Sequence, residues 1–312
     1  MEHTTVLLNE AVSALDIKTD GVYVDATFGR GGHSRKILEH LGQEGILVVF
    51  DKDPEAIKIA EQLALDDKRV LVVHSGFKNL VYELQRLNIK KINGILFDFG
   101  LSTPQLDQAE RGFSFRFEAP LDMRMDNSQG ITAKEWLNQV SEQELAQVIK
   151  VYGEERFYRK VAREIVSYRE NKEIETTKEL ADLISRTIKV RHKGQHPATR
   201  TFQAIRIKIN QELEEIKIVL PDLLNVLDSG GRLVSIAFHS LEDRIIKQFI
   251  KKNSSPEYHP KWVMIKDNGR QEMPLRIVGK PIKPSNEEVS HNYRSRSAIM
   301  RVAVHAGGVS DD

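Results

Sequence analysis

The 312-residue sequence contains no cysteine. This absence excludes disulfide bonds, cysteine-ligated zinc or iron–sulfur sites and thiol nucleophiles, and it is typical of a reducing compartment. Long apolar runs are also missing, because the longest, residues 46–50, is far shorter than the roughly 20 residues that span a bilayer. The N-terminal residues show no signal-peptide core. We therefore expect a soluble, cytoplasmic protein that does not enter a membrane.

A large excess of charge of one sign is missing as well. The chain has 46 Lys and Arg residues against 45 Asp and Glu residues, a net charge of +1. The charges are nevertheless unevenly distributed, since residues 186–208 contain seven Lys or Arg residues and no acid. A local basic segment can bind phosphates even when the whole molecule is nearly neutral, although a solvated helix face is the simpler alternative.

Strand and helix patterns alternate over the first hundred residues. The strand patterns cover residues 22–26, 46–50, 70–74 and 92–97, and the helical patterns cover 34–41, 55–65 and 77–88. Strands separated by helices of this length predict right-handed crossovers and a doubly wound, parallel α/β sheet.

The alternation stops after Asp98 and resumes near residue 199. Between these points, helical patterns open at Thr132, Ser141 and Thr176, each with Glu three residues later as in a capping box. We therefore predict an inserted all-helical domain at residues 107–200 within a discontinuous α/β domain.

The predicted α/β domain consists of residues 1–106 and 201–312. Its second part begins with a long helix over residues 199–227, interrupted or kinked near Pro221. The further predicted elements are strands at 232–238 and 297–304, a helix at 241–252 capped by Ser240, and an irregular segment at 254–286.

Three glycines follow the first predicted strand, in the segment DATFGRGGH at residues 25–33. Glycine leaves the main chain open to close approach by a ligand where a strand turns into a helix. Asp51 stands 20 residues after Gly31, at the end of the next strand, where an acid can accept hydrogen bonds from both hydroxyls of an adenosine ribose. A dinucleotide fingerprint, G-x-G-x-x-G, fails because its sixth position is Ser34. The pattern therefore favours S-adenosylmethionine, with a glycine turn that binds no ligand as the alternative.

The fourth predicted strand ends at Asp98 and continues into a loop that contains Pro104. This loop resembles the Asp/Asn/Ser-Pro-Pro-aromatic loop of enzymes that methylate exocyclic amines of bases. Such an amine is a poor nucleophile because its lone pair is delocalised into the ring, so a hydrogen-bond acceptor on its N–H favours methylation. Asp98 is the candidate acceptor, and Phe99 or Phe113 could stack on a base that has left its helix. The alternatives are a helix N-cap for Asp98 and core packing for the two phenylalanines.

Eight segments in one order along the chain carry a family resemblance. They are Asp25–His33, Asp51–Pro54, Asp98–Gln105, Arg111–Phe115, Pro120–Met125, Pro197–Asn210, Ala237–Arg244 and Pro284–Arg301. With these segments the chain resembles, from end to end, the ribosomal RNA small subunit methyltransferase H family. The resemblance implies a class I, Rossmann-like S-adenosylmethionine-dependent methyltransferase fold with a helical insertion. It implies an enzyme that methylates N4 of a cytidine in the decoding region of small-subunit (16S) rRNA. Tyr293 departs from the family pattern, where we expect Pro.

The resemblance also implies which residues bind the cofactor. They are Gly31, Gly32, His33, Asp51, Phe77, Asp98 and Gln105. The two glycines and His33 would wrap the methionine part, and Asp51 would hold the ribose. Phe77 would flank the adenine, where many relatives use an acid, and Asp98 and Gln105 would close the pocket near the methyl group.

Basic and aromatic residues are candidates for contacts with the RNA. They are Phe99, Phe113, Arg191, Lys193, Arg200, His239, Arg294 and Arg296. For His239, a structural role is as plausible as a substrate contact. No metal-ligand pattern such as His-Glu-x-x-His is found, so no metal is expected.

We therefore expect S-adenosylmethionine as cofactor, 16S rRNA or the small ribosomal subunit as partner, and either a monomer or a homodimer. Three other functions remain open at this point. A DNA amino-methyltransferase is disfavoured because the loop lacks Pro-Pro-Tyr, and a nicotinamide-dependent oxidoreductase because of Ser34. A non-catalytic ribosome assembly factor is disfavoured because Gly31, Asp51 and Asp98 are all present.

Overall fold

The computed structural model describes residues 5–189, 196–256 and 273–307. The chain divides into two compact units. One, the α/β unit, consists of residues 1–100 and 213–312, and the other, the inserted unit, consists of residues 101–212.

This division differs from the sequence-based boundaries at 106/107 and 200/201. Helix α10 (Thr199–Asn210) belongs to the inserted unit, because it packs against α6 (Ala133–Gln139) and α7 (Glu142–Gly153). Its apolar pattern continues into the next helix, which is why sequence analysis assigned most of it to the α/β part.

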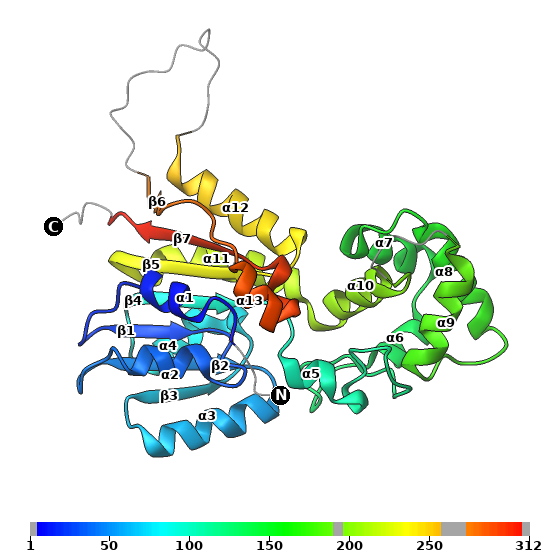
Figure 1. Ribbon diagram of the computed structural model, residues 1–312, viewed down its shortest axis with the longest axis horizontal. Coiled ribbons are helices and arrows are strands. Elements are labelled where there is room, and N and C mark those ends of the chain that lie inside the picture. Colours follow the sequence, from blue (N-terminus) through cyan, green and yellow to red (C-terminus); the bar gives the residue numbers. More distant parts are fainter. Residues whose placement is uncertain (1–4, 190–195, 257–272, 308–312) are drawn as a thin grey trace, which may run out of the picture. The chain divides into compact units, whose positions relative to one another are not determined.

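The α/β unit contains one seven-stranded sheet in the order β3-β2-β1-β4-β5-β7-β6 (Figure 1). The strands are β1 (Val22–Asp25), β2 (Ile46–Asp51), β3 (Val70–His74), β4 (Ile92–Asp98), β5 (Leu227–Ala237), β6 (Leu275–Ile277) and β7 (Ile299–His305). Strands β1 to β5 are parallel, and β7 is antiparallel to both β5 and β6. The predicted doubly wound α/β fold with a helical insertion is confirmed. The expectation that all of residues 254–286 are irregular is wrong, because β6 lies within them and pairs with β7.

The central strands are covered on both faces. Leu47, Val48, Val49 and Phe50 of β2 all have no solvent exposure, although successive side chains of a strand point to opposite faces. Strands of parallel sheets that carry helices on both faces are apolar throughout, and this accounts for the continuous apolar run.

The strand order reverses between β1 and β4. Asp25, the last residue of β1, lies beside Val49 of β2 on one side and Leu96 of β4 on the other. The chain builds β2 and β3 to one side of β1, and β4 and β5 to the other. In open α/β sheets ligands bind at such a reversal, beyond the carboxyl ends of the strands. Asp25, Asp51 and Asp98 end three strands at this place.

Helices connect and cover the strands of the α/β unit. They are α1 (Leu8–Ala14), α2 (Gly32–Leu38), α3 (Pro54–Asp66), α4 (Leu80–Arg86), α11 (Glu212–Val226), α12 (Ser240–Ser254) and α13 (Asn286–His291), with 3-10 turns η1 (Phe77–Asn79) and η3 (Tyr293–Ser297). Pro54 occupies the first turn of α3, and the Asp53 side chain accepts a hydrogen bond from the Glu55 N–H, so the sequence itself starts this helix. The helix predicted at 77–88 begins instead as η1.

The inserted unit is helical and has a hydrophobic core of its own, around Trp136, Leu145, Ile165 and Phe202. Its further elements are α5 (Thr103–Asp107), η2 (Ala109–Arg111), α8 (Tyr158–Arg169) and α9 (Thr177–Thr187). The predicted caps Thr132, Ser141 and Thr176 each accept a hydrogen bond from the N–H three residues later.

Helix α8 was not predicted. Its N-cap is Phe157, whose apolar side chain cannot accept a hydrogen bond from the helix. The capping signal that predicted the other helices of this unit is therefore missing.

The long helix predicted at 199–227 is wrong in one respect. The chain breaks at Gln211, whose φ of 53° ends α10, and Pro221 lies inside α11 without ending it. This break lies next to the boundary between the two units, which falls between residues 212 and 213. Among the described residues, no helix is both long and apolar enough to cross a membrane.

Asn210 fastens the end of α10 to a loop of the inserted unit. Its Oδ1 accepts a hydrogen bond from the Met125 N–H (2.7 Å), and its Nδ2 donates to the Met123 carbonyl (2.7 Å). Met123 has a left-handed φ of 62°, so this loop depends on outside contacts to hold its conformation.

We expect Asn210→Ala to lower the free energy of unfolding by about 2 kcal/mol, because it leaves buried main-chain groups without partners. Urea denaturation followed by circular dichroism measures this change. Asn171→Ala, which removes an exposed amide, is the matched control and should change stability by less than about 0.5 kcal/mol. Equal effects of the two substitutions would contradict the anchoring role.

Candidate functional site

A glycine turn leads from β1 into α2. Gly29 and Gly31 have φ values of 56° and 75°, a backbone conformation that favours glycine. The Gly31 N–H donates to the Phe28 carbonyl, and the Phe28 N–H donates to the Phe50 carbonyl of β2. The turn is therefore held against the end of the neighbouring strand.

Gly32, the first residue of α2, is constrained by the N-terminal segment. A Cβ at this position would lie 1.8 Å from Thr5 Oγ1 and 3.0 Å from Thr5 Cβ. The sequence pattern suggested that glycine here serves only ligand approach. The structure adds a packing reason that the pattern did not reveal.

Asp51 closes the glycine turn from β2. Its Oδ2 accepts a hydrogen bond from the Gly29 N–H (2.8 Å), and its Oδ1 accepts one from the Asp53 N–H (2.8 Å). Each carboxylate oxygen can accept a further hydrogen bond, so the two hydroxyls of a ribose can still be held. Burial raises the pKa of Asp51, and its main-chain donors act in the opposite direction.

Asp98 is held where β4 ends. Its N–H donates to Thr27 Oγ1 (2.7 Å), and its Oδ2 lies 3.7 Å from His33 Nδ1. The side chain is 22% exposed, yet Oδ1 is buried and has no hydrogen-bond partner among the described residues. Burial, followed by the negative charges of Asp25 and Glu242, raises the pKa of Asp98 well above its usual value.

Asp25 and Ser34 form a buried pair beneath this site. The Ser34 hydroxyl donates to Asp25 Oδ2 (2.6 Å), and the Thr27 N–H donates to Oδ1 (3.2 Å). Burial raises the pKa of Asp25 to about 6, although the hydrogen bond from Ser34 lowers it. Sequence analysis used Ser34 only as evidence against a dinucleotide, and it gave no role to Asp25. The position of an acid at the end of the first strand was the available signal.

The acids at the ends of β1 and β4 make this site suited to a cation. A carboxylate with a raised pKa and an unpartnered buried oxygen gains most from a positive group placed beside it. A sulfonium is such a group, and it makes its methyl group electrophilic without the help of a metal ion. The residues present therefore fit S-adenosylmethionine.

Three aromatic rings pack together beside the site. The Phe77 ring meets those of Phe97 and Phe99 edge-on, with centroids 5.5 Å and 5.7 Å away, and Phe97 stacks on Phe99 at 5.2 Å. Phe99 is 4% exposed. It is therefore part of the packing that supports Phe77, and a role in stacking on a base remains a prediction.

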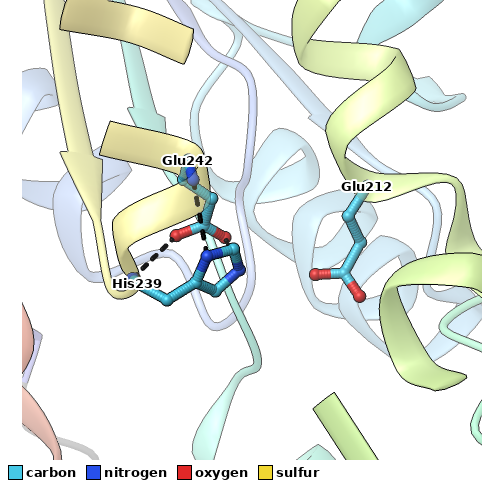
Figure 2. A group of neighbouring side chains, drawn as sticks. All are labelled: Glu212, His239 and Glu242. Carbon is cyan, nitrogen blue, oxygen red and sulfur yellow. Dashed lines mark hydrogen bonds and ion pairs between the residues drawn. The ribbon is translucent and has the colours of Figure 1, made fainter. Parts of the chain in front are cut away.

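His239 begins α12 through a reciprocal capping arrangement with Glu242 (Figure 2). Its Nδ1 accepts a hydrogen bond from the Glu242 N–H, and the Glu242 carboxylate accepts one from the His239 N–H. The predicted cap Ser240 is wrong, because the helix begins one residue earlier than that pattern indicated. Glu242, which sequence analysis missed, is 1% exposed. Glu212, also drawn, belongs to the inserted unit and pairs there with Arg206.

The structure places Gly31, Gly32, His33, Asp51 and Asp98 at the same edge of the sheet, and their binding of a cofactor stays a prediction. Two other predicted residues belong to the other unit. Gln105 and Phe113 belong to the inserted unit, where Gln105 completes the cap of α5 and Phe113 lies in the core.

The predicted phosphate contacts have varied surroundings. Arg200 donates to the Glu154 carbonyl in the inserted unit, whereas Arg191 and Lys193 lie outside the described residues. Arg294 and Arg296 belong to η3 of the α/β unit. The Arg296 guanidinium lies 4.2 Å from the centre of the Tyr293 ring, so the residue that departs from the family pattern supports an arginine.

Comparisons with known proteins place the chain in a family along nearly its whole length. Residues 1–306 match a family model described as the MraW methylase family. The chain is 56% identical over 306 residues to Ribosomal RNA small subunit methyltransferase H of Neisseria meningitidis serogroup B, covering 98% of this chain and 93% of that protein. It is 56% identical over 301 residues to the protein of the same name from Chromobacterium violaceum, covering 96% of this chain and 94% of that protein. The protein of that name from Aromatoleum aromaticum is 50% identical over 309 residues, with 99% and 98% covered.

The contact between Gly32 and Thr5 can be tested by a double-mutant cycle. We expect Gly32→Ala to lower the free energy of unfolding by about 1–3 kcal/mol, because the added methyl group displaces Thr5. Adding Thr5→Gly should recover much of this loss, and thermal unfolding of the four proteins gives the coupling. A double variant no more stable than Gly32→Ala would show that the contact is not the cause.

Proposed function

The chain belongs to the MraW methylase family, and we propose that it methylates N4 of a cytidine in the decoding region of small-subunit (16S) rRNA with S-adenosylmethionine. One observation carries this proposal: the Asp98 carboxylate at the end of β4 has a buried oxygen beside the glycine turn that finds no hydrogen-bond partner in the part of the chain that the structure describes. The macromolecular partner is 16S rRNA or the small ribosomal subunit, and we propose that the protein acts in the cytoplasm.

The α/β unit supplies the proposed cofactor site. Gly31, Gly32 and His33 hold the methionine part, Asp51 accepts hydrogen bonds from the ribose, and Phe77 flanks the adenine. The two main-chain donors already on Asp51 support this role, because they fix the orientation of its carboxylate before a ligand arrives. Gln105, Phe113 and the basic residues of the inserted unit remain predictions.

Asp98 has the proposed role of positioning the substrate amine. The cofactor, when bound, supplies an electrophilic methyl group on a sulfonium. The cytidine amine is a poor nucleophile, so an acceptor on one of its N–H groups frees the lone pair to point at that methyl group. Asp98 Oδ1 is that acceptor, and it also stabilises the positive charge that develops on the amine. The base has to leave its stack to reach this oxygen, at a cost that is smaller for an unpaired nucleotide.

We expect Asp98→Asn to lower methyl transfer about 100- to 1000-fold, because the amide keeps the shape of the carboxylate and loses its charge. Transfer of labelled methyl groups to small subunits from cells that lack this protein measures the rate. Asp66→Asn, at an exposed position of α3, is the control and should keep full activity. Full activity of Asp98→Asn would overturn the assigned role.

The raised pKa of Asp98 predicts a pH-dependent preference for the charged cofactor. Asp98 is protonated below its raised pKa, and a sulfonium stabilises its ionised form, so affinity for S-adenosylmethionine should rise as the pH rises through that pKa. S-adenosylhomocysteine has no sulfonium charge, so its affinity should change less. Calorimetry with both ligands from about pH 5 to about pH 8 tests this difference.

Asp98→Asn provides the control for the pH experiment. In this variant residue 98 no longer titrates, so the ratio of the two ligand affinities should change less with pH. The remaining, smaller change should come from Asp25, whose pKa is about 6. An unchanged pH profile in Asp98→Asn would assign the effect to another group.

A further inference from the structure

Glu215 is a buried acid on α11 that the proposed reaction does not use. The residue is 4% exposed, and its Oε1 lies 2.9 Å from Lys52 Nζ and 4.0 Å from Lys78 Nζ. Its Oε2 is buried and has no hydrogen-bond partner among the described residues. The ion pair with lysine satisfies one oxygen of this carboxylate and leaves the other without a hydrogen bond. Burying a carboxylate oxygen without a hydrogen bond is costly in free energy.

The carboxylate lies against the loop that follows β3. A Cβ placed on Gly76 would be 3.0 Å from both Oε1 and Oε2 of Glu215. The carboxylate therefore fills the space that a side chain at position 76 would need. The loop has glycine and phenylalanine at positions 76 and 77 and no acid of its own there. Glu215, from the distant helix α11, supplies a carboxylate at this place.

The same loop is joined to the end of β2. The Ser75 N–H donates to the Asp51 carbonyl at 3.0 Å, and Lys52, the partner of Glu215, directly follows Asp51. The ends of β2 and β3 and the Glu215 carboxylate thus form one local cluster within the α/β unit. If Asp51 holds a ribose as proposed, the base attached to that ribose would be within reach of this cluster.

We propose that Glu215 recognises the adenine of the cofactor by accepting a hydrogen bond from its 6-amino group. This proposal rests on the proposed function, which places an adenosine ribose on Asp51. A carboxylate accepts hydrogen bonds and donates none when ionised, so it favours an amino group and repels a 6-oxo group. Lys52 holds Oε1, and we assign the base to Oε2, the oxygen that has no hydrogen-bond partner among the described residues. Glu215 is in this sense a specificity residue, because it selects the base and takes no part in methyl transfer.

The test compares two ligands that differ at this one position of the base. S-adenosylhomocysteine carries the 6-amino group, and S-inosylhomocysteine carries a 6-oxo group. Affinities of both are measured by calorimetry for the full-length wild type, for Glu215→Gln, and for Glu214→Gln, in which a neighbouring glutamate that pairs with Lys217 on the surface of α11 is changed. The ratio of the two affinities does not depend on the fraction of protein that is folded.

We expect the wild type and Glu214→Gln to bind the adenosyl ligand about 10- to 100-fold more tightly than the inosyl ligand. In Glu215→Gln the ratio should fall to a few-fold, because an amide can accept from an amino group or donate to an oxo group. A structural role through Lys52 alone would weaken both ligands equally and keep the ratio, which would overturn the proposal.

Failure of this proposal is distinguishable from failure of the proposed function. Equal binding of the two ligands by the wild type would overturn the role of Glu215 while leaving S-adenosylmethionine as the cofactor. Binding of neither ligand by folded wild-type protein would overturn the proposed function and this inference together.

Discussion

The structure depends most on the concentration of negative charge where β1 and β4 end. Asp25 and Asp98 terminate neighbouring strands, and the Glu242 carboxylate adds a third charge that raises the pKa of Asp98. Among the described residues, no Lys or Arg pairs with Asp98. Burying like charges together is unfavourable unless a cation joins them or a proton neutralises them. Hydrogen bonds with Thr27 keep Asp25 and Asp98 in place, so the fold maintains a site that favours a positively charged ligand.

Much of the α/β unit could be predicted from the sequence because its signals are local. The buried strand at residues 46–51 is an uninterrupted apolar run, and Asp53 with Pro54 marks the start of α3. The position of Asp51 beside the glycine turn was also predictable, because a parallel α/β topology places the ends of β1 and β2 side by side. The capping boxes of the inserted unit likewise depend on residues three apart.

The features that sequence analysis missed depend on long-range contacts or on single backbone angles. The break at Gln211 is one residue with a left-handed φ in a continuous helical pattern, and no glycine marks it. His239 rather than Ser240 caps α12: serine is the commoner N-cap residue, but here the Glu242 main chain and carboxylate form a reciprocal cap with His239. Glu215 is 139 positions after Gly76, so only the folded chain brings its carboxylate to the loop after β3. Predictions from pattern fail at such places, where a distant partner decides the outcome.

Two acids of the α/β unit, Asp98 and Glu215, differ in their charged neighbours. This difference matches the two different ligand groups that we propose they bind. Within the described ranges Asp98 has no lysine or arginine partner, and its pKa is raised, so its charge state responds to a nearby cation. Glu215 has Lys52 beside it, with Oε1 2.9 Å from Nζ. A carboxylate paired with a lysine suits the proposed recognition of a neutral amino group, whereas one buried beside other acids suits the proposed sulfonium. The difference follows from Lys52 at the end of β2, since no described lysine or arginine pairs with the acid at the end of β4.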